Sequence, residues 1–383
     1  MNPGLHSLDL HRIDTSCPRQ SLYLLGAEGI VYSETQHRFA GLDAAGVSAY
    51  RAFDAGARLQ DLRECRDDGS FSSPPEDGLE TIHALSQGIF PSEISHEEWP
   101  PLDSFRNANI EIQGIPVLLE YPAGPLEDLC RDYFRHCPTT TRPAQCHLYA
   151  RQEENGWAID ANGRTLLSQL RNEQIGLGFL HAARSLLYAK AEYDVAFHAA
   201  MVANEELGVL FCAPRESGKS TLTASLVARG FDLLTDEPAL LHLDTSSVSS
   251  LGLPVSLKEG SWPVFAAEWP QLTSAPVHVR SDGVKIRLLH PPQSRHSTLP
   301  RRLTHIVFPE YNPSSAARVE QLSPFRALGL LNEGGMILAG HIDRNRFEAF
   351  LRLIYATPAY TMRYASLEEA IQIVHKTYIQ NLA

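Results

Sequence analysis

The chain has 383 residues, of which 43% are hydrophobic and 20% charged, so its composition is globular and its length fits two or three domains. A formal net charge of −12 excludes non-specific nucleic-acid binding by the surface as a whole. The first residues lack a basic start before an apolar run, and no apolar stretch is long enough for a membrane helix. We therefore expect a cytoplasmic protein with neither nucleic-acid nor membrane partners.

Three parts follow one another along the chain. Residues 1–65 predict a small α+β domain, because apolar runs at 22–25 and 29–32 flank glycines that suit a hairpin turn. Asp43 is typical of a helix start. Residues 66–104 are dominated by turn and breaker residues and predict a linker. Residues 105–383 alternate strand and helix patterns, so we expect an α/β catalytic domain there.

Within that last part, the patterns predict a series of short strands and a few longer helices. Ser366 and Glu369 have the spacing of a capping box at the start of a final helix. The other expected elements are strands at 110–112, 116–119, 146–151, 157–159 and 359–364, and helices at 126–136, 173–189, 324–331 and 344–355.

A glycine-containing loop between a strand and a helix carries the main functional signal. An apolar run at 206–212 predicts the strand, and a helix-forming stretch follows at 222–229. This order predicts a Walker A site that wraps the phosphates of ATP. A chance Gly-Lys-Ser in an ordinary strand–turn–helix is the alternative. The loop residues are Ala213, Pro214, Arg215, Glu216, Ser217, Gly218, Lys219, Ser220 and Thr221.

Each residue type in this loop has a physical role in such a site. Gly218 lets the backbone approach the phosphates, Lys219 supplies a positive charge, and Ser220 offers a hydroxyl to Mg²⁺. Glu216 does not fit this pattern, because a carboxylate inside the loop would repel a nucleotide. It must point outward or pair with a cation such as Arg215.

Two further signals flank the loop. An apolar run at 231–235 ends in Asp236 and Glu237, and carboxylates there suit both Mg²⁺ coordination and activation of a hydroxyl. Upstream, His198 interrupts the apolar run 195–200. A histidine in such a run is either a hydrogen-bonded core residue or a residue with a chemical role, and the run alone does not decide.

Together these residues resemble the HPr kinase/phosphorylase superfamily, and more closely its HPr-kinase-related branch of stand-alone serine or peptide kinases. The resemblance covers roughly residues 110–383. It implies a P-loop core of the HPr kinase/phosphoenolpyruvate carboxykinase type with a mixed sheet, using ATP and Mg²⁺. It rests on His198, the loop 213–221, the turn Arg229-Gly230-Phe231 and the run Thr235-Asp236-Glu237.

The resemblance also implies a reaction, namely transfer of the γ-phosphoryl group of ATP to a serine hydroxyl of a peptide or protein. Asp236 would take the hydroxyl proton, and His198 would lie near the acceptor and tune that base. Lys219 would contact the phosphates. Ser220 and Glu237, together with Asp236, would bind Mg²⁺.

The acceptor is less well defined than the chemistry. Glu216 replaces a small residue of that family, and Glu237 stands where true HPr kinases carry aspartate. The C-terminal segment by which the classical enzymes grip HPr is not recognisable either, so HPr itself is not the expected substrate. Residues 22–62 resemble the small peptide-binding winged-helix domain of peptide-modification pathways, the RiPP recognition element. That likeness implies a ribosomally made precursor peptide as acceptor, although a plain packing appendage is as good a reading. Relatives assemble through their catalytic domains, so a homo-oligomer is an open expectation.

Two other functions fit the same sequence. The site could attach a nucleotidyl group, which would release pyrophosphate from ATP in place of ADP. It could also belong to a nucleotide-dependent regulatory protein in which Glu216 has weakened catalysis.

Overall fold

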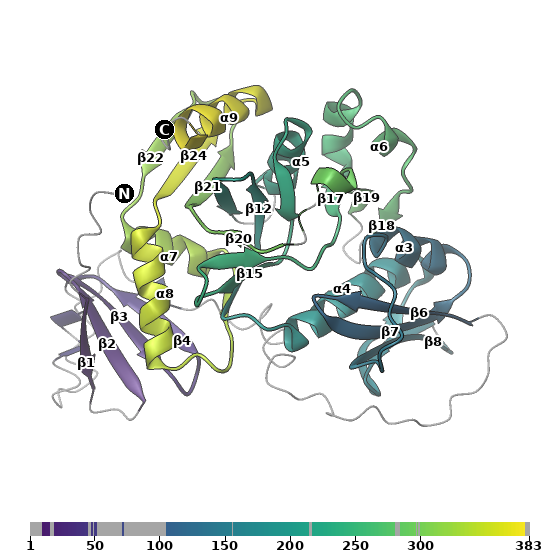
Figure 1. The fold of residues 1–383 in the computed structure, drawn as a ribbon, viewed down its shortest axis with the longest axis horizontal. Coiled ribbons are helices and arrows are strands. Elements are labelled where there is room, and N and C mark those ends of the chain that lie inside the picture. The colour runs from purple at the N-terminus through teal and green to yellow at the C-terminus, as the bar shows by residue number, and fades with distance from the viewer. Residues whose placement is uncertain are drawn as a thin grey trace.

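The chain is a mixed α/β protein with several sheets (Figure 1). The computed structural model describes residues 10–15, 19–44, 47–48, 50–51, 71–72, 105–154, 156–213, 217–279, 284–295, 297 and 299–379. In Figure 1 the N-terminal strands lie beside helix α8 (Arg344–Ala356), and the sheet that contains β6–β8 lies on the other side of the molecule. None of the described helices is long and apolar enough to cross a membrane.

The N-terminal strands form one antiparallel sheet in sequence order. The expected hairpin at 22–32 is confirmed by β2 and β3, which pair directly. The start of the helix at Asp43 is confirmed too, since Val47 N donates to Asp43 O (2.8 Å). Its end and the helix expected near 59–62 lie outside the described residues. The strands are β1 (Leu10–Asp14), β2 (Gln20–Leu25), β3 (Glu28–Ser33), β4 (Arg38–Leu42) and β5 (Phe71–Ser72).

The strand β5 falls inside the segment 66–104, for which the sequence predicts a linker. Residues 71–72 pair with β4 and thereby extend the N-terminal sheet. The remainder of that segment lies outside the described residues, and the domain limits 1–65, 66–104 and 105–383 stay a prediction.

The N-terminal sheet packs against α8 through aromatic side chains. Tyr32 stacks on Phe347 with ring centroids 4.0 Å apart, and its hydroxyl donates to Ile342 O (2.6 Å). Tyr23 points from the same face of the sheet, because Tyr32 lies opposite Ser21 in the register. Its hydroxyl donates to a second carbonyl at the start of α8, that of Arg344 (3.0 Å). The sheet therefore shares its core with the C-terminal part of the chain.

A second sheet with two helices follows. Strand order is β10-β9-β8-β7-β6, parallel only between β7 and β8. The expected strands and both helices at 126–136 and 173–189 are confirmed, whereas β10 has no counterpart among the predictions. The elements are β6 (Phe105–Ile112), β7 (Ile115–Pro122), α3 (Pro125–Tyr133), β8 (Cys146–Glu153), β9 (Gly156–Ala161), β10 (Arg164–Leu170) and α4 (Asn172–Lys190).

Six strands of the remaining residues form a mixed sheet of order β14-β12-β13-β21-β24-β22. Strand β13 runs parallel to β21, and β21 runs parallel to β24. Strand β14 points the same way as β13, because both are antiparallel to β12 between them. The strands are β12 (Ala199–Ala203), β13 (Gly208–Cys212), β14 (Asp232–Thr235), β21 (His305–Tyr311), β22 (Arg318–Gln321) and β24 (Ala359–Tyr364).

Two smaller sheets flank this central one. One has the order β20-β16-β15-β11-β23, and the other the order β17-β19-β18. Their strands are β11 (Val195–Phe197), β15 (Ala239–His242), β16 (Ser247–Ser249), β17 (Val255–Lys258), β18 (His278–Val279), β19 (Lys285–Leu289), β20 (Arg301–Arg302) and β23 (Met336–Leu338). The helices around the central sheet are α5 (Lys219–Ala228), α6 (Gln271–Ser274), α7 (Pro324–Glu333) and α9 (Leu367–Ile373).

The C-terminal elements agree with the predictions. The expected capping box is present in a shifted form at the start of α9. Ser366 Oγ accepts from Glu369 N (3.2 Å), and the Glu369 carboxylate accepts from Ala365 N (2.7 Å), one residue before the cap. Two backbone donors at the helix start are thereby satisfied.

The contact between the N-terminal sheet and α8 should carry a large share of the stability. Phe347→Ala is expected to lower the free energy of unfolding by about 3–5 kcal/mol, because it empties a fully buried aromatic site. Arg352→Ala is the matched control on α8, since that side chain is 48% exposed and should change stability by less than about 0.5 kcal/mol. Urea denaturation followed by circular dichroism measures both. Equal midpoints for the two variants would contradict this packing role.

Candidate functional site at the strand ends

Four strands of the central sheet end at the same edge. Strands β13, β14, β21 and β24 point in one direction, so their carboxyl ends and the turns that follow them lie together. In open α/β sheets, ligands bind outside the carboxyl ends of the strands. The glycine-containing loop follows β13, and Asp236 with Glu237 follows β14. The topology therefore brings the sequence-predicted residues to one edge.

The loop ends in a left-handed glycine. Gly218 has φ 88 and ψ 10, and α5 begins at the next residue. A Cβ at Gly218 would lie 3.1 Å from the hydroxyl of Tyr364, so both backbone conformation and space favour glycine. The Lys219 ammonium donates to the carbonyl of Ala213 across the loop.

The other loop residues are described in part. Ser217 Oγ is buried and has no hydrogen-bond partner within the described part of the chain. Thr221 is half-buried in the first turn of α5. Pro214, Arg215 and Glu216 lie outside the described residues, so the orientation expected for Glu216 stays a prediction.

Asp236 is held against the start of α5. Its Oδ2 accepts from Ser220 Oγ (3.1 Å) and from Ser256 N (3.2 Å). Its Oδ1 is buried without a hydrogen-bond partner among the described residues. Burial raises the pKa of Asp236 to about 6, and the neighbouring charge of Glu237 adds to this, although the two hydrogen bonds and Lys219 oppose it.

Glu237 has the opposite surroundings. Its Oε1 lies 2.6 Å from His198 Nδ1 and 3.3 Å from Arg184 Nη1. Burial alone would raise the pKa of Glu237, but Arg184, His198 and Lys219 outweigh it and lower the pKa to about 2. The two adjacent carboxylates thus titrate in different pH ranges, Glu237 near pH 2 and Asp236 near pH 6. The structure brings His198 to Glu237, the neighbour of the expected base.

Arg184 is a site residue that the sequence analysis missed. It comes from α4, whose residues around it are mostly buried, and it also interacts electrostatically with Tyr133. Burial opposes its charge, but Tyr133 and Glu237 more than compensate, so the pKa of Arg184 is raised. A signal existed in the sequence, because Arg184 lies on the same helix face as Leu180, Leu187 and Tyr188, which are all buried. Taken alone, however, an arginine at such a position is as typical of a solvent-exposed helix residue as of a buried site residue.

Comparisons with known proteins leave the family open. No family model matches the chain, and no curated protein matches it. Among solved structures, the HPr(Ser) kinase/phosphatase from Coxiella burnetii matches with a TM-score of 0.24 and 12% identity, over 48% of this chain and 98% of that chain. A TM-score this low does not establish a shared fold.

The residues present fit a nucleotide with a bound metal ion better than a metal ion held by protein alone. No group of three His, Cys, Asp or Glu side chains in the described part of the chain could hold an ion. A hydroxyl and a carboxylate lie together, however, at Ser220 and Asp236. Mg²⁺ is commonly bound by one or two such oxygens with the remaining ligands from phosphates and water.

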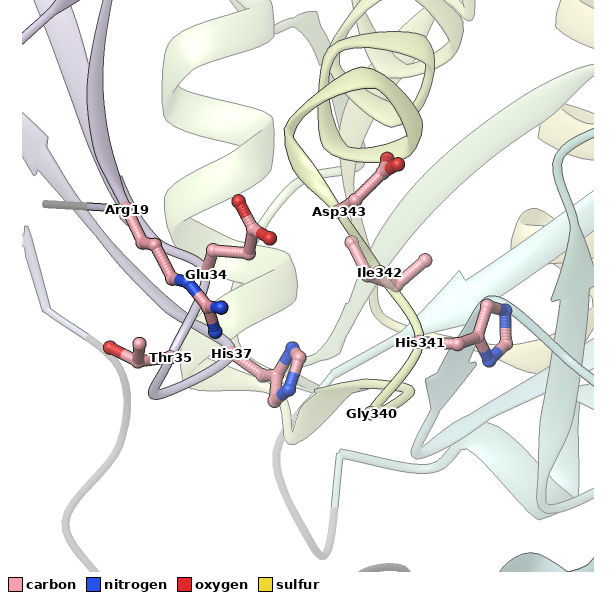
Figure 2. Close-up of a pocket in the computed structure, with 8 residues that line it drawn as sticks. All are labelled: Arg19, Glu34, Thr35, His37, Gly340, His341, Ile342 and Asp343. Carbon is pink, nitrogen blue, oxygen red and sulfur yellow. The ribbon is translucent and has the colours of Figure 1, made fainter.

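Two cavities lie away from this edge. One, of about 290 Å³, lies between the β3–β4 turn and the segment before α8 (Figure 2). Its two acids are already engaged, since Glu34 pairs with Arg344 (3.3 Å) and Asp343 caps α8. The other, of about 230 Å³, is lined by residues around the ends of α8 and β24. Neither cavity includes a residue of the strand-end site.

Removing the charge of Asp236 and removing the charge of Glu237 should have opposite effects on the stability of the folded state. Asp236 has its pKa raised from 3.8 to about 6, so its charge destabilises the folded state above pH 6, and this cost fades as pH falls toward 4. Glu237 has its pKa lowered from 4.5 to about 2, so its stabilising charge is present above pH 4.5 and is lost as pH falls toward 2.

We therefore expect Asp236→Asn to raise the free energy of unfolding at pH 8 and Glu237→Gln to lower it, each by roughly 1–3 kcal/mol. The difference for Asp236→Asn should disappear as pH falls from 6 to 4, whereas that for Glu237→Gln should persist to about pH 4.5 and fade only toward pH 2. Urea denaturation of the wild type and both variants between pH 2 and pH 8 measures this. Destabilisation of Asp236→Asn at pH 8 would contradict the assigned environment.

Proposed function

We propose that the protein is an ATP-dependent kinase that transfers the γ-phosphoryl group to a serine hydroxyl of a peptide or protein. The observation that carries the proposal is the contact between Ser220 and Asp236. It sets a carboxylate with a pKa of about 6 beside the first turn of the helix that follows the glycine-containing loop. A kinase needs this combination of a phosphate-binding helix start and a base within reach of it.

Phosphate binding is assigned to the loop and the start of α5. Gly218 leaves space for a close approach of phosphate oxygens to the backbone, and the helix start adds partial positive charge from its dipole. The Lys219 ammonium bonds to the carbonyl of Ala213 and can turn from it to the β- and γ-phosphates.

Mg²⁺ would be held by Ser220 and the two carboxylates Asp236 and Glu237, with the nucleotide phosphates completing its ligands. When bound, it neutralises charge on the transferring group. Glu237 suits binding of a cation, because its low pKa keeps the carboxylate charged throughout the neutral range.

Asp236 is the group assigned to accept the proton. Its pKa of about 6 leaves it ionised at pH 7, yet basic enough to take a proton from a serine hydroxyl. The serine oxygen then bonds to the γ-phosphorus, the bond from that phosphorus to the β,γ-bridging oxygen breaks, and ADP leaves. His198 and Arg184 contribute through Glu237, whose charge helps to keep the pKa of Asp236 high.

Substitutions of Lys219 and of Asp236 should affect nucleotide binding and turnover separately. Lys219→Ala is expected to abolish measurable ATP binding, whereas Asp236→Asn should bind ATP and lose about 10²–10⁴-fold in turnover. Lys285→Ala, an exposed lysine on β19, is the matched control and should behave as the wild type. Calorimetric titration with Mg²⁺ and ATP measures binding, and ADP release measures turnover. Normal turnover by Asp236→Asn would show that the base is another group.

The acceptor should be a serine, and a ribosomally made precursor peptide is the first candidate to test. Incubation with peptide, ATP and Mg²⁺ is expected to add one phosphoryl group to a serine, seen by mass spectrometry with fragmentation. A peptide with that serine replaced by alanine is the control. Release of pyrophosphate with a nucleotidyl adduct would favour the nucleotidyltransferase alternative, and ATP binding without any product would favour a regulatory protein.

A further inference from the structure

The strand-end edge carries an exposed tyrosine that the proposed function does not use. Tyr311 is the last residue of β21, the parallel neighbour of β13, and it is 53% exposed. Its Cβ lies 3.7 Å from the position of a Cβ at Gly218, so the side chain starts directly beside the phosphate loop. Single exposed apolar side chains are common and mean nothing alone. The position beside Gly218 is what distinguishes this one.

The backbone under the ring is fixed by hydrogen bonds. Asn312 N donates to Tyr364 O (2.9 Å), and the Asn312 side chain accepts from Ser314 N (3.1 Å). Tyr364 is buried next to it, with the two tyrosine rings 5.7 Å apart at 46°. The exposed ring of Tyr311 therefore projects from an ordered turn with a second aromatic ring behind it. Little ordering entropy remains to be lost when a ligand stacks on such a ring.

The order of the strands places Asp236 and Tyr311 on opposite sides of β13 at this edge. Asp236 follows β14, which lies two strand positions from β13, or about 10 Å. Tyr311 lies on the opposite side of β13, one position or about 5 Å away. A ligand whose phosphates lie on the loop between them must extend toward one side or the other. The carboxylates occupy the side where transfer of the terminal phosphoryl group is assigned.

We propose that a purine nucleoside triphosphate lies across these strand ends, with its terminal phosphate toward Asp236 and its base stacked on the exposed ring of Tyr311. The inference rests on the proposed function, because the loop has to bind phosphates. Every base offers a flat π-surface to an aromatic ring, and a purine offers the larger one. Tyr311 is therefore a residue that determines affinity for the base and has no part in the transfer.

The test separates the base from the phosphates. Calorimetric titration of the full chain with ATP and with inorganic tripolyphosphate, both with Mg²⁺ at one salt concentration, compares ligands with and without a base. Tyr311→Ala is expected to raise the Kd for ATP by about tenfold and to leave that for tripolyphosphate unchanged. Tyr311→Phe keeps the ring and should stay within about twofold of the wild type for both. Leu299→Ala, which removes another exposed apolar side chain, is the control.

The possible outcomes are distinct. An unchanged Kd for ATP in Tyr311→Ala would overturn the stacking role and leave the phosphate site standing. Equal weakening of ATP and tripolyphosphate would overturn it too, because the tyrosine would then shape the loop. Wild-type protein that binds neither ligand would refute the proposed function itself. A selective loss of ATP affinity in Tyr311→Ala, absent from Tyr311→Phe, supports the inference.

Discussion

Two carboxylates in succession at the end of one strand set the main electrostatic constraint on this molecule. Like charges this close and this buried cannot both ionise unless cations neutralise one of them. Glu237 receives the Arg184 guanidinium and a close contact from His198, while Asp236 receives neutral hydrogen-bond donors. The pKa values are therefore driven apart, so that Glu237 stays charged down to about pH 2 while Asp236 titrates near pH 6. Divergence of this kind is a common way to create a base beside a fixed charge.

This constraint also ties distant parts of the chain together. Arg184 belongs to α4, which packs against the sheet of β6–β10, whereas His198 stands between β11 and β12. Both must reach the same oxygen of Glu237 for its charge to be tolerated. The sheet of β6–β10 with helix α4 thus contributes to the candidate site as well as to the core. Any rearrangement that withdraws Arg184 would leave a half-buried carboxylate with less compensation.

The sequence predicts those features whose signals are local. The capping pair Ser366 and Glu369, the helix of residues 173–189 and the strand–loop–helix around Gly218 each depend on neighbours in the chain. Strand β10 was missed because most of its side chains are at least partly exposed and show no clear alternation. Arg184 was missed because its partner lies 53 positions later in the numbering (237 − 184) and is reached only through the tertiary fold.

Strand order is the other feature that local patterns do not supply, and it decides which residues share the edge. Gly218 and Tyr311 are neighbours only because β13 and β21 pair in parallel. Asp236 reaches the same edge because an antiparallel strand, β12, separates two strands that run the same way. A sheet of mixed direction can thus keep one functional edge, provided that the strands bearing functional residues remain parallel to one another. The direction of the strands decides which residues lie at this edge, and the distance between those residues in the sequence does not.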